Sequence, residues 1–293
     1  MNILRLTLLF IIFQIVLSAN SIKPLHTFTA SGGVTQLLIK DNKLFASTSY
    51  STIDIFNLDS KKLIKTIKFE KITDFLGDKV HAKVYSIDIL GDKILTLSQG
   101  EKGGRNLALY KNDKFIPLIK DTKRMFIEKA AFLDENRVIF SLLSNELILF
   151  DIDKKKILKK IDVSLSKFSD FILSDDKSKI IIADESGDLK IHNTKNLAFI
   201  KKLAKHNLDN VYQVDFSNDI IVTAGQDRKS VIYNLNFDIT KEIKSDFLIY
   251  SCGVSPSGKY AGISINEQND VLIFNTTNLN KITYLKDNPA LIS

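Results

Sequence analysis

The residues best able to do chemistry in this chain are few and scattered. The histidines are His26, His81, His192 and His206, and none has another His or Cys at the spacing of a zinc site. Cys252 is the single cysteine, so no disulfide can form within the chain. No Ser-His-Asp order, pair of catalytic carboxylates or nucleophile elbow stands out. The sequence therefore predicts no catalytic residue, no metal site and no cofactor.

Two polar stretches have some of the residues of a ligand-binding loop. Residues 100–104 are rich in glycine, but neither a Lys-Ser/Thr pair nor a helix follows, as a phosphate loop requires. Residues 184–188 are acidic, but the twelve-position spacing and closing Glu of a calcium loop are absent. We interpret the first stretch as a flexible insertion and the second as an ordinary turn.

A short pattern, apolar–x–apolar–aromatic, recurs along the chain and indicates the elements that position these residues. The aromatic place of its copies is occupied by Phe56, Tyr110, Phe150, His192, Tyr233 and Phe274. The intervals between these positions are 54, 40, 42, 41 and 41 residues. A period of about 40–45 residues with several strands per period is typical of a β-propeller blade.

Each period divides into four short strands, of which the second is apolar and the fourth alternates Lys with Ile or Leu. The blades are predicted at residues 34–69, 84–120, 128–163, 168–204, 211–244 and 249–286. The fold class is thus all-β, a WD40-like β-propeller of about six four-stranded blades, with seven or an incomplete seventh as the alternative. The long first interval places insertions at residues 70–82 and 99–106. An extra strand is expected at residues 24–29, although residues 281–285 already offer the last blade an outer strand.

The fifth blade carries the clearest set of special residues. His206 precedes its first strand, Asp227 lies in its second turn, and Tyr233 occupies the aromatic place of the third strand. This set resembles the WD40 repeat, which implies a structural network with Tyr233 in place of the Trp. His192 and Cys252 lie within strand patterns, and we expect a core histidine and a buried, inert thiol there.

Composition and the N-terminal residues indicate the cellular location of the protein and the partners it does not favour. The formal charge is +7, but only five of the 41 basic residues are Arg, which favours solubilising Lys over a nucleic-acid site. Arg5, an apolar run at residues 6–17 and the small residue Ala19 predict a signal peptide at residues 1–19. We therefore expect a periplasmic protein with one propeller domain at residues 22–293, and no stable membrane insertion after cleavage.

Several further stretches carry a resemblance to a known family. They are residues 82–88, 104–106, 173–179, 184–187, 221–228 and 247–256, of which 223–228 is the most distinctive. The chain resembles the NapL family, WD40-like accessory proteins of the periplasmic nitrate reductase system of some bacteria. The resemblance implies a non-enzymatic role, with nitrate reductase subunits among the partners. Members of that family extend through another blade, so the resemblance leaves six or seven blades open.

These observations favour a scaffold that binds proteins through the turns between its strands. Arg105, Gln226 and Arg228 are the predicted partner contacts, because an Arg in a turn can bind carboxylates with two hydrogen bonds. A general cell-envelope scaffold is the first alternative. A cofactor-binding redox propeller is the second, and the lack of Trp and of convergent His or Cys ligands argues against it.

Overall fold

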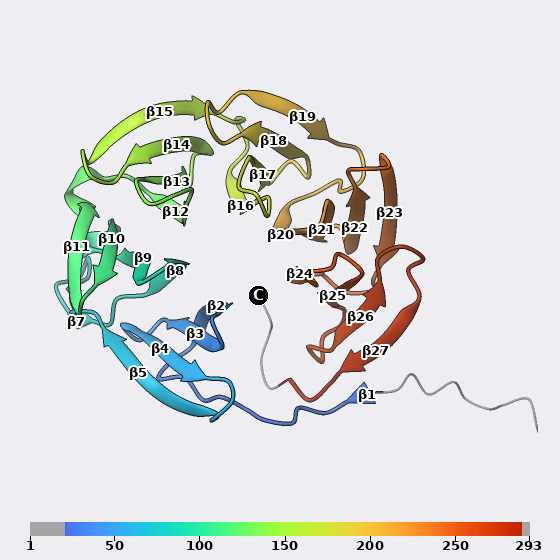
Figure 1. Cartoon of the computed structure of the whole chain (residues 1–293), viewed down its shortest axis with the longest axis horizontal. Coiled ribbons are helices and arrows are strands. Elements are labelled where there is room, and N and C mark those ends of the chain that lie inside the picture. The colour runs from blue at the N-terminus through green and yellow to red at the C-terminus, as the bar shows by residue number, and fades with distance from the viewer. Residues whose placement is uncertain (1–20, 289–293) are drawn as a thin grey trace, which may run out of the picture.

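Residues 21–288 of the computed structural model are described; the predicted signal peptide lies outside them. The chain forms six four-stranded antiparallel sheets arranged in a ring around a central channel (Figure 1). This arrangement confirms the predicted six-bladed propeller, and each copy of the repeated pattern lies in the third strand of its blade. We number the blades in chain order and the strands of each blade from the channel outward.

The strand bounds agree with the predicted blades to within a few residues. Blade one contains β2 (Val34–Lys40), β3 (Lys43–Thr48), β4 (Thr52–Asn57) and β5 (Lys62–Lys68), and blade two contains β8 (Val84–Leu90), β9 (Lys93–Gln99), β10 (Arg105–Lys111) and β11 (Lys114–Ile119). Blade three contains β12 (Ile127–Phe132), β13 (Arg137–Leu142), β14 (Glu146–Asp151) and β15 (Lys156–Asp162), and blade four contains β16 (Phe168–Leu173), β17 (Lys179–Asp184), β18 (Leu189–Asn193) and β19 (Phe199–Leu203). Blade five contains β20 (Val211–Ser217), β21 (Ile220–Gly225), β22 (Lys229–Asn234) and β23 (Ile239–Lys244), and blade six contains β24 (Cys252–Val254), β25 (Tyr260–Ser264), β26 (Val271–Asn275) and β27 (Lys281–Leu285).

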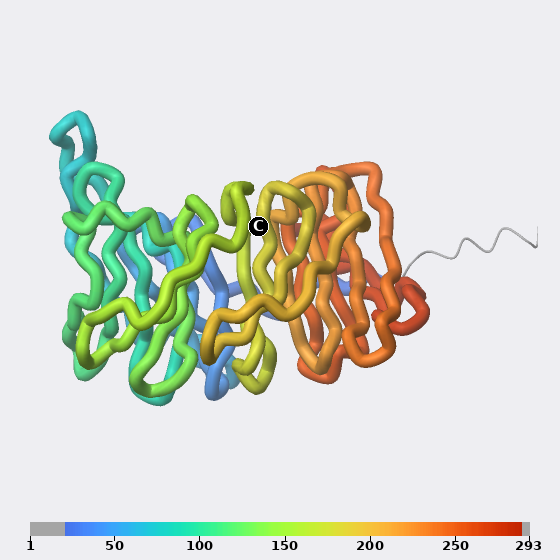
Figure 2. The backbone as a smooth tube through the Cα atoms, turned by 90° about the horizontal axis from the view of Figure 1, so that it is seen from above, coloured from blue at the N-terminus to red at the C-terminus, as the bar shows by residue number. Residues whose placement is uncertain are grey.

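Both predicted insertions carry structure of their own. The first holds the hairpin β6 (Ile72–Thr73) and β7 (Lys79–Val80), which projects beyond one face of the ring (Figure 2). The second holds the short 3-10 helix η1 (Glu101–Gly103). A further 3-10 helix, η2 (Asp121–Lys123), follows blade two.

An extra strand joins the last blade, but it is not the predicted segment 24–29. The strand β1 (Ser21–Ile22) pairs in parallel with β27. The chain then crosses to blade one without regular structure, where the Phe28 ring lies 5.2 Å from that of Phe56. Asp54 then accepts hydrogen bonds from the amide and hydroxyl groups of Ser31. Residues 24–29 therefore bridge blades six and one along the outside of the ring instead of pairing.

Five apolar clusters hold the ring together, one at each seam from blades one and two to blades five and six. Middle strands are buried because neighbouring blades cover both of their faces, and each buried Ile, Leu or Phe contributes about 1.5–3 kcal/mol. Between blade six and blade one, no such cluster is formed by residues 21–288.

Side chains of the first strands also tie neighbouring blades together. At four seams, a carboxylate or carboxamide oxygen accepts a hydrogen bond from a backbone N–H of the next blade. The acceptor and donor pairs are Gln36–Ile87, Asp88–Phe132, Asp170–Val214, Gln213–Cys252 and Asp215–Val254, at 2.7–3.0 Å. At the seam of blades three and four, Lys129 Nζ lies 2.7 Å from Asp170 Oδ1 instead. All five seams are thus joined by polar as well as apolar contacts.

The sixth seam, between blade six and blade one, differs in both respects. The strand registers make Leu37, Ile87 and Phe171 equivalent positions of blades one, two and four. Leu37 is 58% exposed, whereas Ile87 and Phe171 are 2% and 1% exposed. Gly253 of blade six is the equivalent of Asp215 in blade five, and it has no side-chain acceptor to offer. Within residues 21–288, the ring is therefore open at this seam.

Candidate protein-interaction face

The two faces of the ring differ in which turns form them. The upper face, which carries the hairpin β6–β7, consists of the turns between second and third strands and the connections between blades (Figure 2). The lower face consists of the turns between first and second and between third and fourth strands. Because every blade repeats the same antiparallel order, each face collects one kind of turn from all six blades.

Exposed apolar side chains in turns gather on the upper face. They are Tyr50, Phe75, Leu76, Phe126, Leu143, Leu165 and Leu208, with exposures from 37% to 106%. On the lower face, Phe237 is the large apolar residue exposed in a turn of the described chain, and Phe199, Ile239 and Tyr260 are exposed at strand ends beside the turns. Isolated exposed apolar residues are ordinary, but a group of them on one face marks an interaction surface.

The hairpin β6–β7 presents two of these residues on an ordered turn. Asp74 Oδ1 accepts hydrogen bonds from the amides of Leu76 and Asp78, at 2.8 and 2.9 Å. Glu101 Oε2 of η1 accepts another from the Thr73 amide at 2.9 Å. These contacts anchor the hairpin to the second insertion, and they leave Phe75 and Leu76 77% and 88% exposed.

The glycine-rich stretch is folded against blade two and is not the flexible loop we expected. A Cβ on Gly100 or Gly104 would lie 2.4 or 2.6 Å from Asp121 Cβ, so only glycine allows this approach. Asp121 Oδ2 accepts a hydrogen bond from the Glu101 amide at 2.7 Å, and the Asp121 amide donates to Asn106 Oδ1. The Asp121 carboxylate thus accepts the Glu101 amide of this stretch and packs against both glycines.

Arg105 lies within a cluster of its own chain. Its guanidinium carbon is 4.0 Å from the centre of the Tyr85 ring, and its Nη2 lies 3.4 Å from Glu128 Oε1. Its Nη1 also donates to the Gly103 carbonyl oxygen. The side chain is only 14% exposed, so its predicted role as a partner contact would require this cluster to open.

Gln226 lies beside a group of aromatic rings at blades five and six, and Arg228 follows in the same turn. The rings of Tyr212 and Tyr250 stack with their centres 5.2 Å apart, and Phe247 meets Tyr250 edge to face. Gln226 Oε1 accepts a hydrogen bond from the Tyr212 hydroxyl at 2.9 Å. Arg228 is exposed with a φ of 63°. Of the three predicted contacts, Arg228 is the one most open to solvent.

The special residues of blade five form two small networks rather than one. The His206 ring meets that of Tyr233 edge to face at 5.7 Å, and its Nδ1 lies 3.0 Å from Glu242 Oε1. This contact with His206 lowers the pKa of Glu242. Burial raises the pKa of Tyr233.

Asp227 instead binds Asn207, at the centre of the second network. Asn207 Nδ2 donates to Asp227 Oδ1 at 3.1 Å, and the Thr223 hydroxyl donates to Asn207 Oδ1 at 2.8 Å. A Cβ on Gly225 would lie 2.5 Å from Asn207 Nδ2, so glycine is needed here. Sequence reasoning missed Asn207, whose adjacency to His206 was the available signal.

A buried polar group that the sequence did not reveal joins blades three and four below the upper face. Asp184 is fully buried and accepts hydrogen bonds from Lys190 at 2.5 Å, Ser164 at 2.7 Å and Asn145 at 2.9 Å. Burial alone would raise the pKa of Asp184, but the hydrogen bonds from Lys190, Ser186 and Ser164 outweigh burial and lower it. The predicted turn at residues 184–188 is present, and its first residue also has this structural role.

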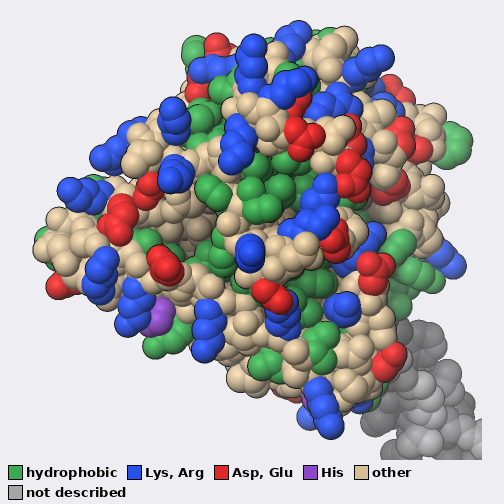
Figure 3. Space-filling model, turned by 60° about the vertical axis from the view of Figure 1, so that its left-hand side comes forward, with side chains coloured by type: hydrophobic (Ala, Val, Ile, Leu, Met, Phe, Trp, Pro, Cys, Tyr) green, Lys and Arg blue, Asp and Glu red, His purple; other side chains and the backbone are tan. Residues whose placement is uncertain are grey.

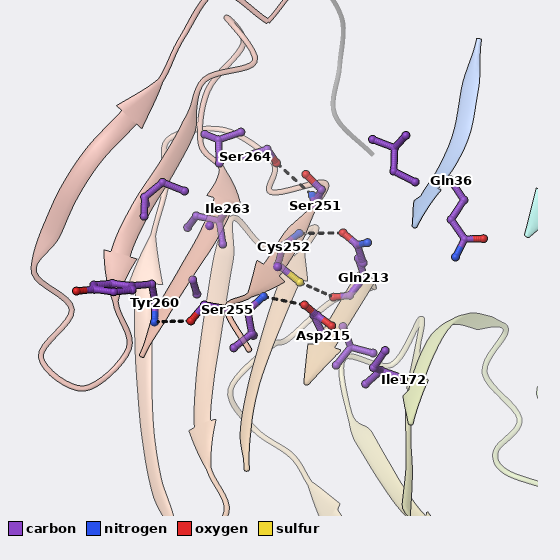
Figure 4. Close-up of a pocket in the computed structure, with 18 of the residues that line it drawn as sticks. Gln36, Ile172, Gln213, Asp215, Ser251, Cys252, Ser255, Tyr260, Ile263 and Ser264 are labelled. Atoms are coloured by element: carbon purple, nitrogen blue, oxygen red, sulfur yellow. Dashed lines mark hydrogen bonds between the residues drawn. The ribbon is translucent and has the colours of Figure 1, made fainter. Parts of the chain in front are cut away.

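A cavity of about 930 Å³ lies where the open seam meets the channel, with Gln36 on one side and blade six on the other (Figure 4). Both oxygens of Asp215 accept backbone hydrogen bonds, from Phe216 and Val254. Burial raises the pKa of Asp215, against the opposing effect of these hydrogen bonds.

Cys252 lines this cavity and is half-buried, with its thiol directed between the strands of blade five. Its Sγ lies 3.2 Å from the Val222 carbonyl oxygen and 3.6 Å from the Gln213 carbonyl oxygen, the second of which is drawn in Figure 4. Burial, followed by the charge of Asp215, raises the pKa of Cys252. The thiol is therefore protonated at neutral pH and a weak nucleophile, as predicted. His192 is likewise a core residue as predicted, 5% exposed, with Nδ1 at 3.1 Å from the Leu197 carbonyl oxygen.

The described residues hold neither a cluster of metal-ligating side chains nor a helix that could cross a membrane. Within residues 21–288, no group of three or more His, Cys, Asp or Glu side chains is placed to hold a metal ion. No helix in the same part of the chain has the length and apolar character needed to cross a membrane.

Comparison with known proteins yields one distant relative and no family. No protein-family model matches the chain. Cilia- and flagella-associated protein 337 B of Tetrahymena thermophila is 29% identical over 176 residues, which cover 56% of this chain. The matched part is only 14% of that protein's length. The six-bladed β-propeller is therefore the class that the structure defines, and the comparisons assign the chain to no family.

Proposed function

We propose that this chain is a non-enzymatic scaffold that binds protein partners through the upper face of its propeller. The observation that supports this proposal is the concentration of exposed apolar side chains in the turns of that face. Interfaces gain most of their affinity from a few apolar or aromatic anchors surrounded by polar residues. Phe75, Leu76 and Leu165 are the most exposed candidates for such anchors.

We further propose that the protein acts in the periplasm and supports assembly or function of periplasmic nitrate reductase. Export is supported by the predicted signal peptide at residues 1–19, and the nitrate link by the resemblance to the NapL family. Nitrate reductase subunits are the proposed partners under this reading. A general cell-envelope scaffold would use the same face with other partners.

The test is affinity capture from a periplasmic extract with the tagged protein, followed by rebinding of each purified candidate partner. Leu76→Asp and Leu165→Asp place charges on the upper face, and Phe237→Asp is the matched control on the lower face. We expect each upper-face variant to weaken binding at least about tenfold and the control to leave it unchanged. Equal loss in all three variants, or in none, would reject the upper face.

The nitrate link has its own test. Deletion of the gene is expected to lower nitrate reductase activity in intact cells, and the Leu76→Asp, Leu165→Asp double variant is expected not to restore it. Unchanged activity and maturation of the catalytic subunit would reject the link. Capture of envelope-assembly proteins without any nitrate reductase subunit would favour the general scaffold.

A further inference from the structure

We infer that the groove between the outer strands of blades two and three binds an acidic, amphipathic peptide segment of a protein partner. This inference rests on the proposed scaffold function, but it concerns the rim of the ring and not the upper face. The rim groove is the hollow between β11 and β15, with a volume of about 650 Å³. In Figure 3 the two blades come forward, and apolar side chains gather there among Lys and Arg.

The floor of the rim groove is apolar and firmly held. Leu118 and Ile119 are 9% and 5% exposed, and they belong to the cluster that joins blades two and three. Met125 packs against the same cluster. Ile157, which is 41% exposed, lines one side of the groove. A volume within about 300–1,000 Å³ over a preformed apolar floor suits a small number of ligand side chains.

The edges of the rim groove are positive. Lys120, Lys123, Lys155 and Lys156 line it, and no Asp or Glu does. None of these four ammonium groups forms an ion pair within residues 21–288, although many lysines elsewhere do. Four unpaired cations around an apolar floor are complementary to carboxylates that alternate with apolar side chains.

The neighbouring groove, between blades one and two, shows that this charge pattern is not general. It has a volume of about 780 Å³, and Glu70, Glu101, Asp113 and Asp121 line it together with lysines. Lys65 and Asp113 form an ion pair there at 2.5 Å. That groove has carboxylates of its own, whereas no Asp or Glu lines the rim groove, so an acidic segment has a preferred position.

The chemistry favours a peptide over other anions. The chain offers Lys rather than Arg at these edges, and a nucleic acid has no apolar side chains to cover the floor. The apolar residues lie between two outer strands instead of projecting from them, which disfavours insertion into a lipid surface. A protein segment with alternating Glu and Leu fits both the floor and the edges.

The test uses a short fluorescein-labelled peptide of alternating Glu and Leu, with fluorescence anisotropy on the whole protein. The double variant Lys155→Glu, Lys156→Glu changes lysines that line only the rim groove, and it is expected to weaken binding at least about tenfold, as should added salt. The double variant Lys68→Glu, Lys71→Glu makes the same charge change at the neighbouring groove and should leave binding unchanged. All four side chains changed in these two variants are exposed, so circular dichroism should show native melting in both.

Further measurements on the same protein can overturn the inference. Ile157→Asp should weaken binding if the apolar floor takes part, and unchanged affinity would reject the groove. Equal binding of an alternating Lys and Leu peptide would reject the charge argument. Binding of phosphatidylserine vesicles that is lost in Lys155→Glu, Lys156→Glu, without peptide binding, would assign the groove to membranes instead. Loss of the upper-face interaction leaves these outcomes unaffected, so the two proposals can fail separately.

Discussion

The seam between blades five and six and the seam between blades six and one are built from the same kind of sheet, yet only the first is closed. At the first, Gln213 and Asp215 accept amides of blade six above a shared apolar cluster. At the second, Ser251 and Gly253 hold the equivalent places, and Leu37 and Ile39 are 58% and 67% exposed. All six blades thus have the same strand order, whereas contact between two neighbouring blades depends on a few side chains of the first strand.

The largest expected effect comes from truncating equivalent residues on closed and open seams. Phe171→Ala should lower the free energy of unfolding by about 3–5 kcal/mol, because it leaves a cavity at the seam of blades three and four. Leu37→Ala should cost less than about 1 kcal/mol, because its side chain is already half exposed. Urea unfolding measures both. Similar losses would mean that the sixth seam closes in solution.

A pH dependence is expected from the closed seam of blades five and six. Burial raises the pKa of Asp215 above its ordinary 3.8, so the unfolded chain releases this proton first as pH rises. The contribution of Asp215 to the free energy of unfolding should therefore fall as pH rises from about 4 through the raised pKa, and then level off. Asp215→Asn keeps an acceptor for the Val254 amide and removes the titration.

The variant should differ from the natural protein by less than about 1 kcal/mol below about pH 3, where Asp215 is protonated in the folded chain because its pKa lies above 3.8. At neutral pH, Asp215→Asn should have a higher free energy of unfolding than the natural protein. Urea unfolding across this range measures the difference. Parallel stability curves at all pH values would show that Asp215 does not titrate differently in the folded and unfolded chains.

The smallest expected effect comes from giving the open seam an acceptor. A Cβ on Gly253 would meet only Asp215 Oδ2, at 3.9 Å, so a side chain fits. Gly253→Asn should be more stable than Gly253→Ala by about 0.5–1 kcal/mol if its carboxamide reaches blade one. Slower amide exchange at Leu37 and Ile39 would accompany this gain. Equal stability of the Asn and Ala variants would mean that more than one acceptor is missing.

The sequence was sufficient for the blades because each period repeats a pattern set by burial. The aromatic place that Phe56 shares with Phe274 lies in a third strand in every copy, and even His192 is buried there. The open seam could not be predicted in this way. Leu37 and Ile39 have the same apolar alternation as Ile87 and Ile89, and their exposure depends on what blade six places opposite them.

The polar contacts were less predictable because their partners are distant in sequence. Arg105 in a glycine-rich turn suggested an exposed cation, but Tyr85 and Glu128 enclose it. The buried pair of Asp184 and Lys190 resembled an ordinary turn and a surface strand. The lysines of the rim groove are unremarkable in a Lys-rich chain until the structure shows which of them lack acidic neighbours.

The hairpin β6–β7 has one more consequence. Six similar blades give the upper face an approximate six-fold rotational symmetry, which alone would let a partner dock in several equivalent orientations. The hairpin projects beside one blade only (Figure 2). The hairpin and the open seam together make the six orientations of a partner about the ring axis non-equivalent. A partner that contacts Leu76 would therefore be held in a single orientation about the ring axis.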